Sequence, residues 1–211
     1  MLLGLTGGYC AGKNRAGEIL ESLGWASIDV DKLGHQALEL ARDEVVRRFD
    51  AVARSRFGRG LLDEKGILDR RLLGRLVFSD PHLLGEHEAI VHPHMFRLVD
   101  EGVAALREAA LSRGEGEARI VINAAILYKM PILSTCEAVI EVRAPLLRRL
   151  ARAKTRDGLG LRAALERIGR QQALWRRRPR SGPPVLVLHN KGDLKALERS
   201  LGALLARIGT E

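Results

Sequence analysis

The chain has 211 residues, of which 46% are hydrophobic and 29% are charged, and 35 Lys and Arg against 26 Asp and Glu give it a net charge of +9. This composition is ordinary for a globular protein and excludes a disordered chain, a collagen-like repeat and a disulfide scaffold. The sequence has no run of 18 apolar residues, the length that a membrane-spanning helix would need. Two cysteines, and an apolar N-terminus that breaks into glycines after six residues, favour one cytoplasmic domain over a secreted one.

Short apolar runs alternate with helical patterns along the chain. Strands are predicted over residues 1–6, 25–29, 118–123, 138–142 and 185–188. Helices are predicted over 15–23, 32–49, most of 54–113 with breaks at 79–81 and 92–93, 148–178 except for 157–158, and 194–208. Strands that alternate with helices favour an α/β fold in which a parallel sheet is flanked by helices.

The positive charge is concentrated in one segment. Residues 148–180 contain twelve Arg and Lys but only two acidic residues, a net charge of +10, so the rest of the chain is close to neutral. Such a segment attracts polyanions, which could be nucleic acid, anionic lipid or a ligand with several phosphates.

A glycine-rich loop follows the first predicted strand. Residues 7–13 read G-G-Y-C-A-G-K, the G-x-x-x-x-G-K spacing of a phosphate-binding loop, placed between a strand and a helix. Glycines let successive backbone N–H groups point at phosphate oxygens, the following helix adds its dipole, and Lys13 would reach the β- and γ-phosphates. We therefore predict that the loop binds the phosphates of a nucleotide; the structural alternative is a glycine turn beside a surface lysine.

The residue after the lysine departs from the motif. A Ser or Thr normally stands there, and its hydroxyl binds Mg²⁺. Here the residue is Asn14, whose carbonyl is also a hard oxygen ligand, although its longer side chain would shift the ion or hold it through water.

Further segments follow the order seen in one known family. The opening LTGGYCAGK resembles LTGGIASGKS of the dephospho-coenzyme A kinases, and the sequence I-D-V-D at 28–31 is similar to their I-D-A-D. Four more segments resemble family motifs: 68–81, 90–93, 152–171 and 187–194. The resemblance covers nearly the whole chain.

This resemblance implies a fold, a reaction and an organisation. The fold would be a P-loop kinase sheet, forming a single domain over 1–211, with a helical acceptor-binding lobe at 31–113 and an arginine-rich lid at 145–182. The reaction would move the γ-phosphoryl group of ATP, with Mg²⁺, to the ribose 3′-hydroxyl of dephospho-coenzyme A, the last step of coenzyme A biosynthesis. The lid would then account for the basic segment, since phosphoryl transfer depends on charge neutralisation.

The candidate site residues follow from the loop and the resemblance. Lys13, Asp31, Arg152 and Arg156 are the candidate catalytic residues. Asp29, Asp31 and His92 are candidates for substrate binding, and Asn14 and Asn123 for metal binding. The candidate nucleotide-binding residues are Gly7, Gly8, Cys10, Ala11, Gly12, Lys13, Asn14, Arg15 and Asn190.

Structural alternatives stand beside several of these roles. Asp29 and Asp31 follow a predicted strand, where parallel sheets bind ligands, and Asp31 is the candidate base that orients and deprotonates the acceptor hydroxyl. It could instead cap the next helix. His92 precedes Pro93 and could merely fix a helix start. Arg152 and Arg156 lie four residues apart on one helix face, where either could be an ordinary surface residue.

The sequence departs from the family at several charged positions. Where the family has an Asp and a Glu near the third strand, this chain has Asn123 and Lys129, and Arg149 replaces a lid Gln. Together with Asn14, these changes weaken metal chemistry specifically and leave the phosphate loop, the aspartates and the lid arginines in place.

Three interpretations remain open. We favour an active dephospho-coenzyme A kinase with a rearranged Mg²⁺ shell. A second is a kinase of the same fold for another nucleotide-like acceptor, and a third is a degenerate kinase that binds nucleic acid or a protein partner. Nucleic acid binding is disfavoured because the basic segment has a single aromatic residue, Trp175, on which bases could stack. The sequence gives no indication of the oligomeric state.

Overall fold

The structure is a computed structural model that describes residues 1–175, 178 and 181–209. Residues 176, 177, 179 and 180, which belong to the predicted lid, and the side chain of Trp175 lie outside the described part. The chain divides into two compact units: a sheet unit of residues 1–31 and 102–211, and a helical unit of residues 32–101. The helical unit falls within the bounds of the predicted acceptor lobe.

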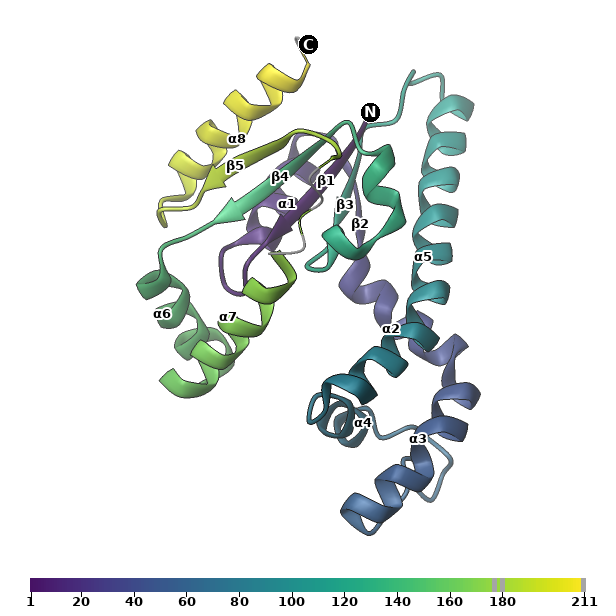
Figure 1. Ribbon diagram of the computed structural model, residues 1–211. Helices are drawn as coiled ribbons and strands as arrows, with labels where there is room; N and C mark the ends of the chain where they lie inside the picture. Colours follow the sequence, from purple (N-terminus) through teal and green to yellow (C-terminus); the bar gives the residue numbers. More distant parts are fainter. Residues whose placement is uncertain (176–177, 179–180, 210–211) are drawn as a thin grey trace. The chain divides into compact units, whose positions relative to one another are not determined.

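The sheet unit contains five parallel strands in the order β2-β3-β1-β4-β5 (Figure 1). The predicted strands are all present, within two residues of their expected bounds, and the predicted α/β fold with a parallel sheet is confirmed. The strands are β1 (Leu2–Gly7), β2 (Ala26–Asp29), β3 (Ile120–Asn123), β4 (Ala138–Arg143) and β5 (Val185–His189).

Helices connect these strands and form most of the helical unit. Those of the sheet unit are α1 (Lys13–Ser22), η1 (Leu127–Lys129), η2 (Pro131–Thr135), α6 (Leu146–Asp157), α7 (Leu161–Trp175) and α8 (Leu194–Ile208). The helical unit contains α3 (Arg42–Phe57) and α4 (Arg70–Val77), while α2 (Val30–Leu40) and α5 (Pro81–Ser112) begin or end in the sheet unit. No described helix has the length and apolar character needed to cross a membrane.

The core of the sheet unit follows from the two-residue period of its strands. Leu3 and Leu5 of β1 are fully buried on the face that carries α1 and α8. Between them, Gly4 faces the other side, where a Cβ would come within 2.6 Å of the Leu127 side chain. This close approach requires glycine, and it seats η1 directly on the central strand.

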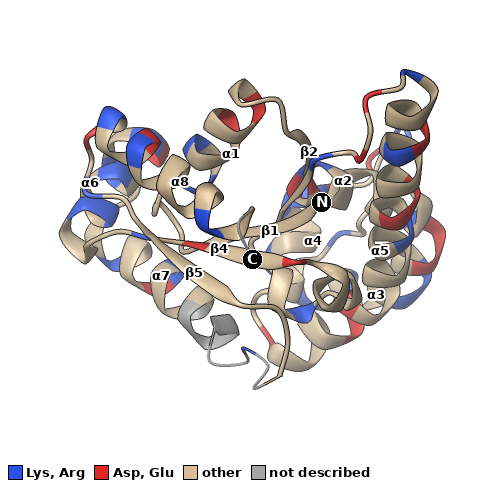
Figure 2. Ribbon diagram, turned by 90° about the horizontal axis from the view of Figure 1, so that it is seen from above, with Lys and Arg blue, Asp and Glu red and all other residues tan. Residues whose placement is uncertain are grey.

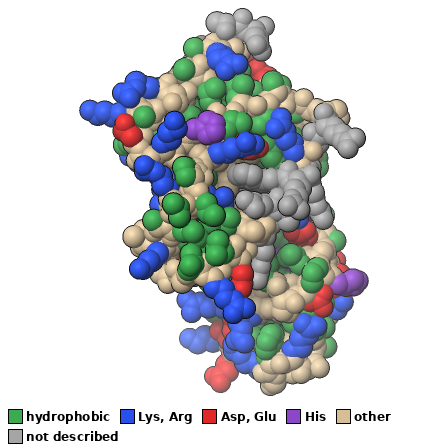
Figure 3. Space-filling model, turned by 60° about the vertical axis from the view of Figure 1, so that its left-hand side comes forward, with side chains coloured by type: hydrophobic (Ala, Val, Ile, Leu, Met, Phe, Trp, Pro, Cys, Tyr) green, Lys and Arg blue, Asp and Glu red, His purple; other side chains and the backbone are tan. Residues whose placement is uncertain are grey.

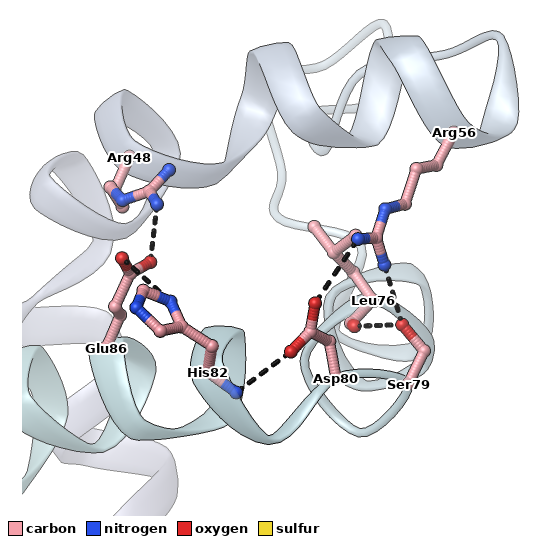
Figure 4. Close-up of polar contacts among 7 residues, drawn as sticks. All are labelled: Arg48, Arg56, Leu76, Ser79, Asp80, His82 and Glu86. Carbon is pink, nitrogen blue, oxygen red and sulfur yellow. Dashed lines mark hydrogen bonds and ion pairs between the residues drawn. The ribbon is translucent and has the colours of Figure 1, made fainter.

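Polar contacts link helices of the helical unit beside its buried apolar side chains. Asp80 accepts a hydrogen bond from the backbone N–H of His82 (2.9 Å), so it caps the start of α5, and it forms an ion pair with Arg56 of α3 (3.4 Å; Figure 4). Arg48 of α3 pairs with Glu86 of α5 at 2.5 Å. The N–H of His82 holds the pKa of the Asp80 carboxyl below its usual value.

Two sequence-based predictions of helix bounds were wrong. The expected break at His92-Pro93 is absent, since α5 continues through Pro93. Val91, Met95 and Val99 form a buried stripe with a period of four, and this packing holds the helix in spite of the missing proline N–H. The helix predicted over 32–49 is divided at Ala41 into α2 and α3.

Candidate active site

The glycine-rich loop joins β1 to α1 at the carboxyl end of the central strand. Gly12 has φ 102°, and a Cβ there would clash with the amide of Asn190, so only glycine fits. Cys10 also has a left-handed conformation, with φ 58°. Helix α1 begins at Lys13 with no side-chain cap. Its first N–H groups therefore lack intrahelical partners and are available to an anion.

A cavity of about 610 Å³ lies beside this loop, within the sheet unit. Most of the predicted site residues line it, namely Gly7, Gly8, Cys10, Gly12, Lys13, Asn14, Arg15, Asp31, Arg152, Arg156 and Asn190. Four other predicted residues, Ala11, Asp29, His92 and Asn123, do not. Gln171, the last residue of the lid motif at 152–171, also lines it, as do Tyr9 and Thr155, for which the sequence indicates no role. Tyr9 occupies one of the x positions of the loop motif. The only feature of the sequence that could indicate a role for it is an aromatic residue where the related motif has Ile.

Lys13 lies in the interior with its ammonium group fixed at two points. Its side chain is only 9% exposed, and Nζ donates a hydrogen bond to Asn123 Oδ1 at 2.6 Å and lies 3.4 Å from Asp31 Oδ2. Gly17 of α1 makes room for Asn123, because a Cβ there would lie 3.2 Å from the Asn123 Nδ2 atom. The ends of β2 and β3 thus hold the lysine beside the phosphate loop.

The two aspartates after β2 have different surroundings. Asp29 Oδ1 accepts a hydrogen bond from the N–H of Asp31 at 3.1 Å, the bond of a helix N-cap, at the start of α2. The structural alternative for Asp31 is therefore wrong, since Asp29 is the residue that caps the helix. The Asp31 side chain is 59% exposed and lines the cavity, where it could accept a proton.

Arg152 and Asn190 hold the outer side of the loop. Arg152 Nη1 donates hydrogen bonds to the carbonyls of Cys10 (3.1 Å) and Ala11 (3.2 Å), and its Nη2 donates to Asn190 Oδ1 (3.2 Å). The buried Asn190 amide in turn donates to the Ala11 carbonyl at 2.9 Å. Because these groups take the loop carbonyls, Arg152 supports the loop as well as lining the cavity.

Arg156 lies one turn further along α6. Its guanidinium donates to both carboxylate oxygens of Asp157, at 2.8 and 2.9 Å, and this bidentate pair lowers the pKa of Asp157 to about 2. Lys and Arg occupy several turns of α6 (Figure 2). On the face shown in Figure 3, basic side chains form separate groups among apolar ones.

His92 and Asn123 have surroundings that the sequence did not indicate. His92 belongs to α5 in the helical unit, where its ring lies 5.4 Å from that of Phe96. Its role in acceptor binding stays a prediction. Asn123, a predicted metal ligand, directs Oδ1 to the Lys13 ammonium. Among the described residues, no group of three or more His, Cys, Asp or Glu could hold a metal ion by itself.

Comparisons with known proteins agree with this geometry. Residues 1–196 match the family model described as "Dephospho-CoA kinase". The dephospho-CoA kinase of Treponema pallidum is 31% identical, covering 99% of this chain and 95% of its own, and that of Thermus thermophilus is 34% identical, covering 99% and 92%.

Solved structures show the same fold. A crystal structure of a Thermus thermophilus protein superposes with a TM-score of 0.74 at 34% identity, covering 98% of this chain and 97% of the other. The dephospho-CoA kinase of Campylobacter jejuni, at 23% identity and a TM-score of 0.54, shares the fold over 98% and 96% of the two chains. With its phosphate loop, parallel sheet and near-complete match, the chain belongs to the dephospho-CoA kinase family.

Proposed function

We propose that this chain transfers the γ-phosphoryl group of ATP to the ribose 3′-hydroxyl of dephospho-coenzyme A, the last step of coenzyme A biosynthesis. The observation that carries the proposal is the position of Lys13, whose buried ammonium lies between the phosphate loop and the exposed carboxylate of Asp31. We place the activity in the cytoplasm, which two unpaired cysteines, Cys10 and Cys136, fit.

The nucleotide phosphates would bind where the backbone donors converge. The uncapped start of α1 offers N–H groups and a positive dipole, and Lys13 places a full charge beside them. Arg156 lines the same cavity from α6. These groups would neutralise the charge that spreads over the γ-phosphoryl oxygens during transfer, which is the main task of a protein in this chemistry.

Asp31 would act on the acceptor. Its exposed carboxylate can accept a hydrogen bond from a ribose hydroxyl and take the proton as the new oxygen–phosphorus bond forms. The ion pair with Lys13 directs this carboxylate into the cavity. Binding of the remainder of the acceptor by residues 31–113 rests on the family resemblance. If it is right, His92→Ala should raise the KM for dephospho-coenzyme A and leave the KM for ATP unchanged.

The residues at the loop fit a magnesium ion that is held mainly by the nucleotide. Mg²⁺ is usually bound through one or two carboxylates, substrate phosphates and water. Asn14 supplies an exposed amide oxygen at the cavity, whereas Asn123 Oδ1 is already engaged by Lys13. Asn14 would thus hold the ion together with the nucleotide phosphates and water, and the ion would neutralise phosphate charge.

A magnesium titration tests this shell. Asn14→Ser restores the short hydroxyl of the family, and Asn123→Asp restores its carboxylate, so we expect the two changes to tighten apparent Mg²⁺ affinity and to act non-additively on one ion. Dephospho-coenzyme A phosphorylation would be followed in the wild type, both single variants and the double variant. Four identical midpoints would show that neither asparagine acts on the metal.

A coupled assay of ADP release tests the proposed reaction. With Mg²⁺ and ATP, we expect turnover that depends on dephospho-coenzyme A and falls at least about a hundredfold in Lys13→Ala, the loss of a charge-assisted phosphate contact. Adenosine and other nucleosides serve as control acceptors. Turnover with those but not with dephospho-coenzyme A would indicate a different kinase. Salt-dependent RNA binding without any turnover would indicate a lapsed enzyme.

A further inference from the structure

We propose that Tyr9 is a positioning residue, which holds the lid arginine Arg156 over the phosphate loop before the nucleotide arrives. The proposal deepens the proposed function and rests on it, because it takes the cavity beside the loop to be the site of the ATP phosphates. Tyr9 stands in the loop where the related motif has Ile.

The aromatic ring of Tyr9 lies against two guanidinium groups from different helices. The guanidinium carbon of Arg156, on α6, is 5.5 Å from the ring centroid, and that of Arg167, on α7, is 5.3 Å away. Both distances are within the range of a cation–π interaction. A single loop residue therefore contacts a charged group from each lid helix, and an Ile at this position would offer no such ring.

The Tyr9 hydroxyl closes the same cluster. It donates a hydrogen bond to Asp157 Oδ2 and accepts one from Arg167 Nη1 at 3.3 Å. Asp157 also accepts the bidentate pair from Arg156. The carboxylate thus binds both the tyrosine and the arginine that stacks on it, which fixes the guanidinium plane from two sides.

The backbone of Tyr9 is bound to the lid as well. Its carbonyl accepts a hydrogen bond from Arg149 Nε of α6 at 2.8 Å, and its N–H donates to Gln171 Oε1 of α7. The next residue, Cys10, packs against Ala153 and Ala164, one small side chain from each lid helix. Side chain, N–H and carbonyl all engage the lid, so the loop and both helices are joined at this residue.

These contacts restrict the side chain of Arg156, which is 58% exposed and lines the cavity. A free arginine on a surface helix loses much rotamer freedom when it binds a phosphate. The Tyr9 ring and Asp157 remove that freedom in advance. Removing them should weaken nucleotide binding and phosphoryl transfer while leaving acceptor binding unchanged.

The test compares Tyr9→Ile, which takes the residue of the related motif, with Tyr9→Phe, which keeps the ring but loses both hydroxyl bonds. The readouts are the Kd of a non-hydrolysable ATP analogue, measured calorimetrically without acceptor, the two KM values, kcat and the Tm. We expect Tyr9→Ile to raise the analogue Kd about tenfold, the cost of ordering one or two flexible side chains. Tyr9→Phe should have a smaller effect, and the KM for dephospho-coenzyme A should not change.

Two further variants separate positioning from plain structural support. Arg162→Ala removes a lid charge from α7 at a side chain that is 95% exposed and pairs only with Glu166 among its described contacts. It should leave the analogue Kd within about twofold of the wild type. In an Arg156→Ala background, Tyr9→Ile should have almost no further effect, because the group it positions is gone.

Three results would overturn the proposal: an unchanged analogue Kd in Tyr9→Ile, an equal effect of Tyr9→Ile with and without Arg156, or a loss that tracks the Tm and is matched by Arg162→Ala. The binding arm separates this proposal from the proposed function. If the wild type binds the analogue but never phosphorylates dephospho-coenzyme A, the function fails, while the comparison of Tyr9 variants still decides the role of Tyr9. A wild type that binds no analogue overturns both.

Discussion

Replacing Asp31 by asparagine separates a catalytic role from a structural one, because the substitution keeps the shape of the side chain but removes its ability to take a proton. If Asp31 is the base for the acceptor hydroxyl, the transfer rate should fall by about 10²–10⁴, equivalent to roughly 3–5.5 kcal/mol at 1.36 kcal/mol per tenfold. The affinity for ATP should change little.

The structure also sets the expected change in stability. The Asp31 side chain is 59% exposed and forms an ion pair with Lys13 at 3.4 Å. Lys13 keeps its shorter bond to Asn123 after the substitution. The pair is buried on the lysine side and exposed on the aspartate side, so we expect its loss to cost about 1 kcal/mol, the upper end of the range for surface pairs. Asp29→Ala should instead lower the free energy of unfolding by about 1 kcal/mol, because it removes the N-cap of α2.

Steady-state kinetics and urea unfolding of both variants make the comparison. Transfer by Asp31→Asn at close to the wild-type rate would exclude Asp31 as the base. A loss of more than about 2 kcal/mol of stability in that variant, too large for a pair with an exposed carboxylate, would instead show a structural role for Asp31.

Three further predictions concern packing. Arg149→Gln should change the free energy of unfolding, measured in urea, by less than about 1 kcal/mol, because it removes a buried Nη2 that has no hydrogen-bond partner among the described residues but also loses the Nε bond to the Tyr9 carbonyl; a change of more than about 2 kcal/mol in either direction would contradict this. Burial raises the pKa of Cys136 to about 11, so at pH 8 only about 0.1% is thiolate and iodoacetamide should leave it unmodified in the native protein, as peptide mapping would show. Pro93→Ala should stabilise α5 by about 1–3 kcal/mol, since alanine restores a backbone N–H that can donate to the Ala89 carbonyl. A thermal midpoint that fails to rise would contradict this prediction.

Much of the sheet unit could be predicted from local pattern. The G-x-x-x-x-G-K spacing, a buried run before it and a helical period after it together indicate β1, the loop and α1 within two residues. Pro93 shows where local reasoning fails, because the stripe of Val91, Met95 and Val99 that carries α5 past the proline is a tertiary effect. A proline signal is local, whereas the burial that overrides it depends on what the helix packs against.

The candidate site also combines residues that local sequence patterns indicate with contacts that they do not. Residue types and motif spacing indicated Lys13 and Asp31, which the structure brings together at 3.4 Å. They did not indicate that Arg152 donates to loop carbonyls, nor that arginines of both α6 and α7 contact the Tyr9 ring. Those contacts join segments more than 140 residues apart in sequence, and no pattern within one segment contains them.

The most direct test of the account is the identity of the product. The purified protein would be incubated with ATP, Mg²⁺ and dephospho-coenzyme A, and the acceptor examined by mass spectrometry and ³¹P NMR. We expect a mass increase of one phosphoryl group and a new phosphomonoester on the ribose 3′-oxygen, formed by the wild type and at least about a hundredfold more slowly by Lys13→Ala. An unmodified acceptor, or a phosphoryl group on any other oxygen, would show that the proposed reaction is wrong.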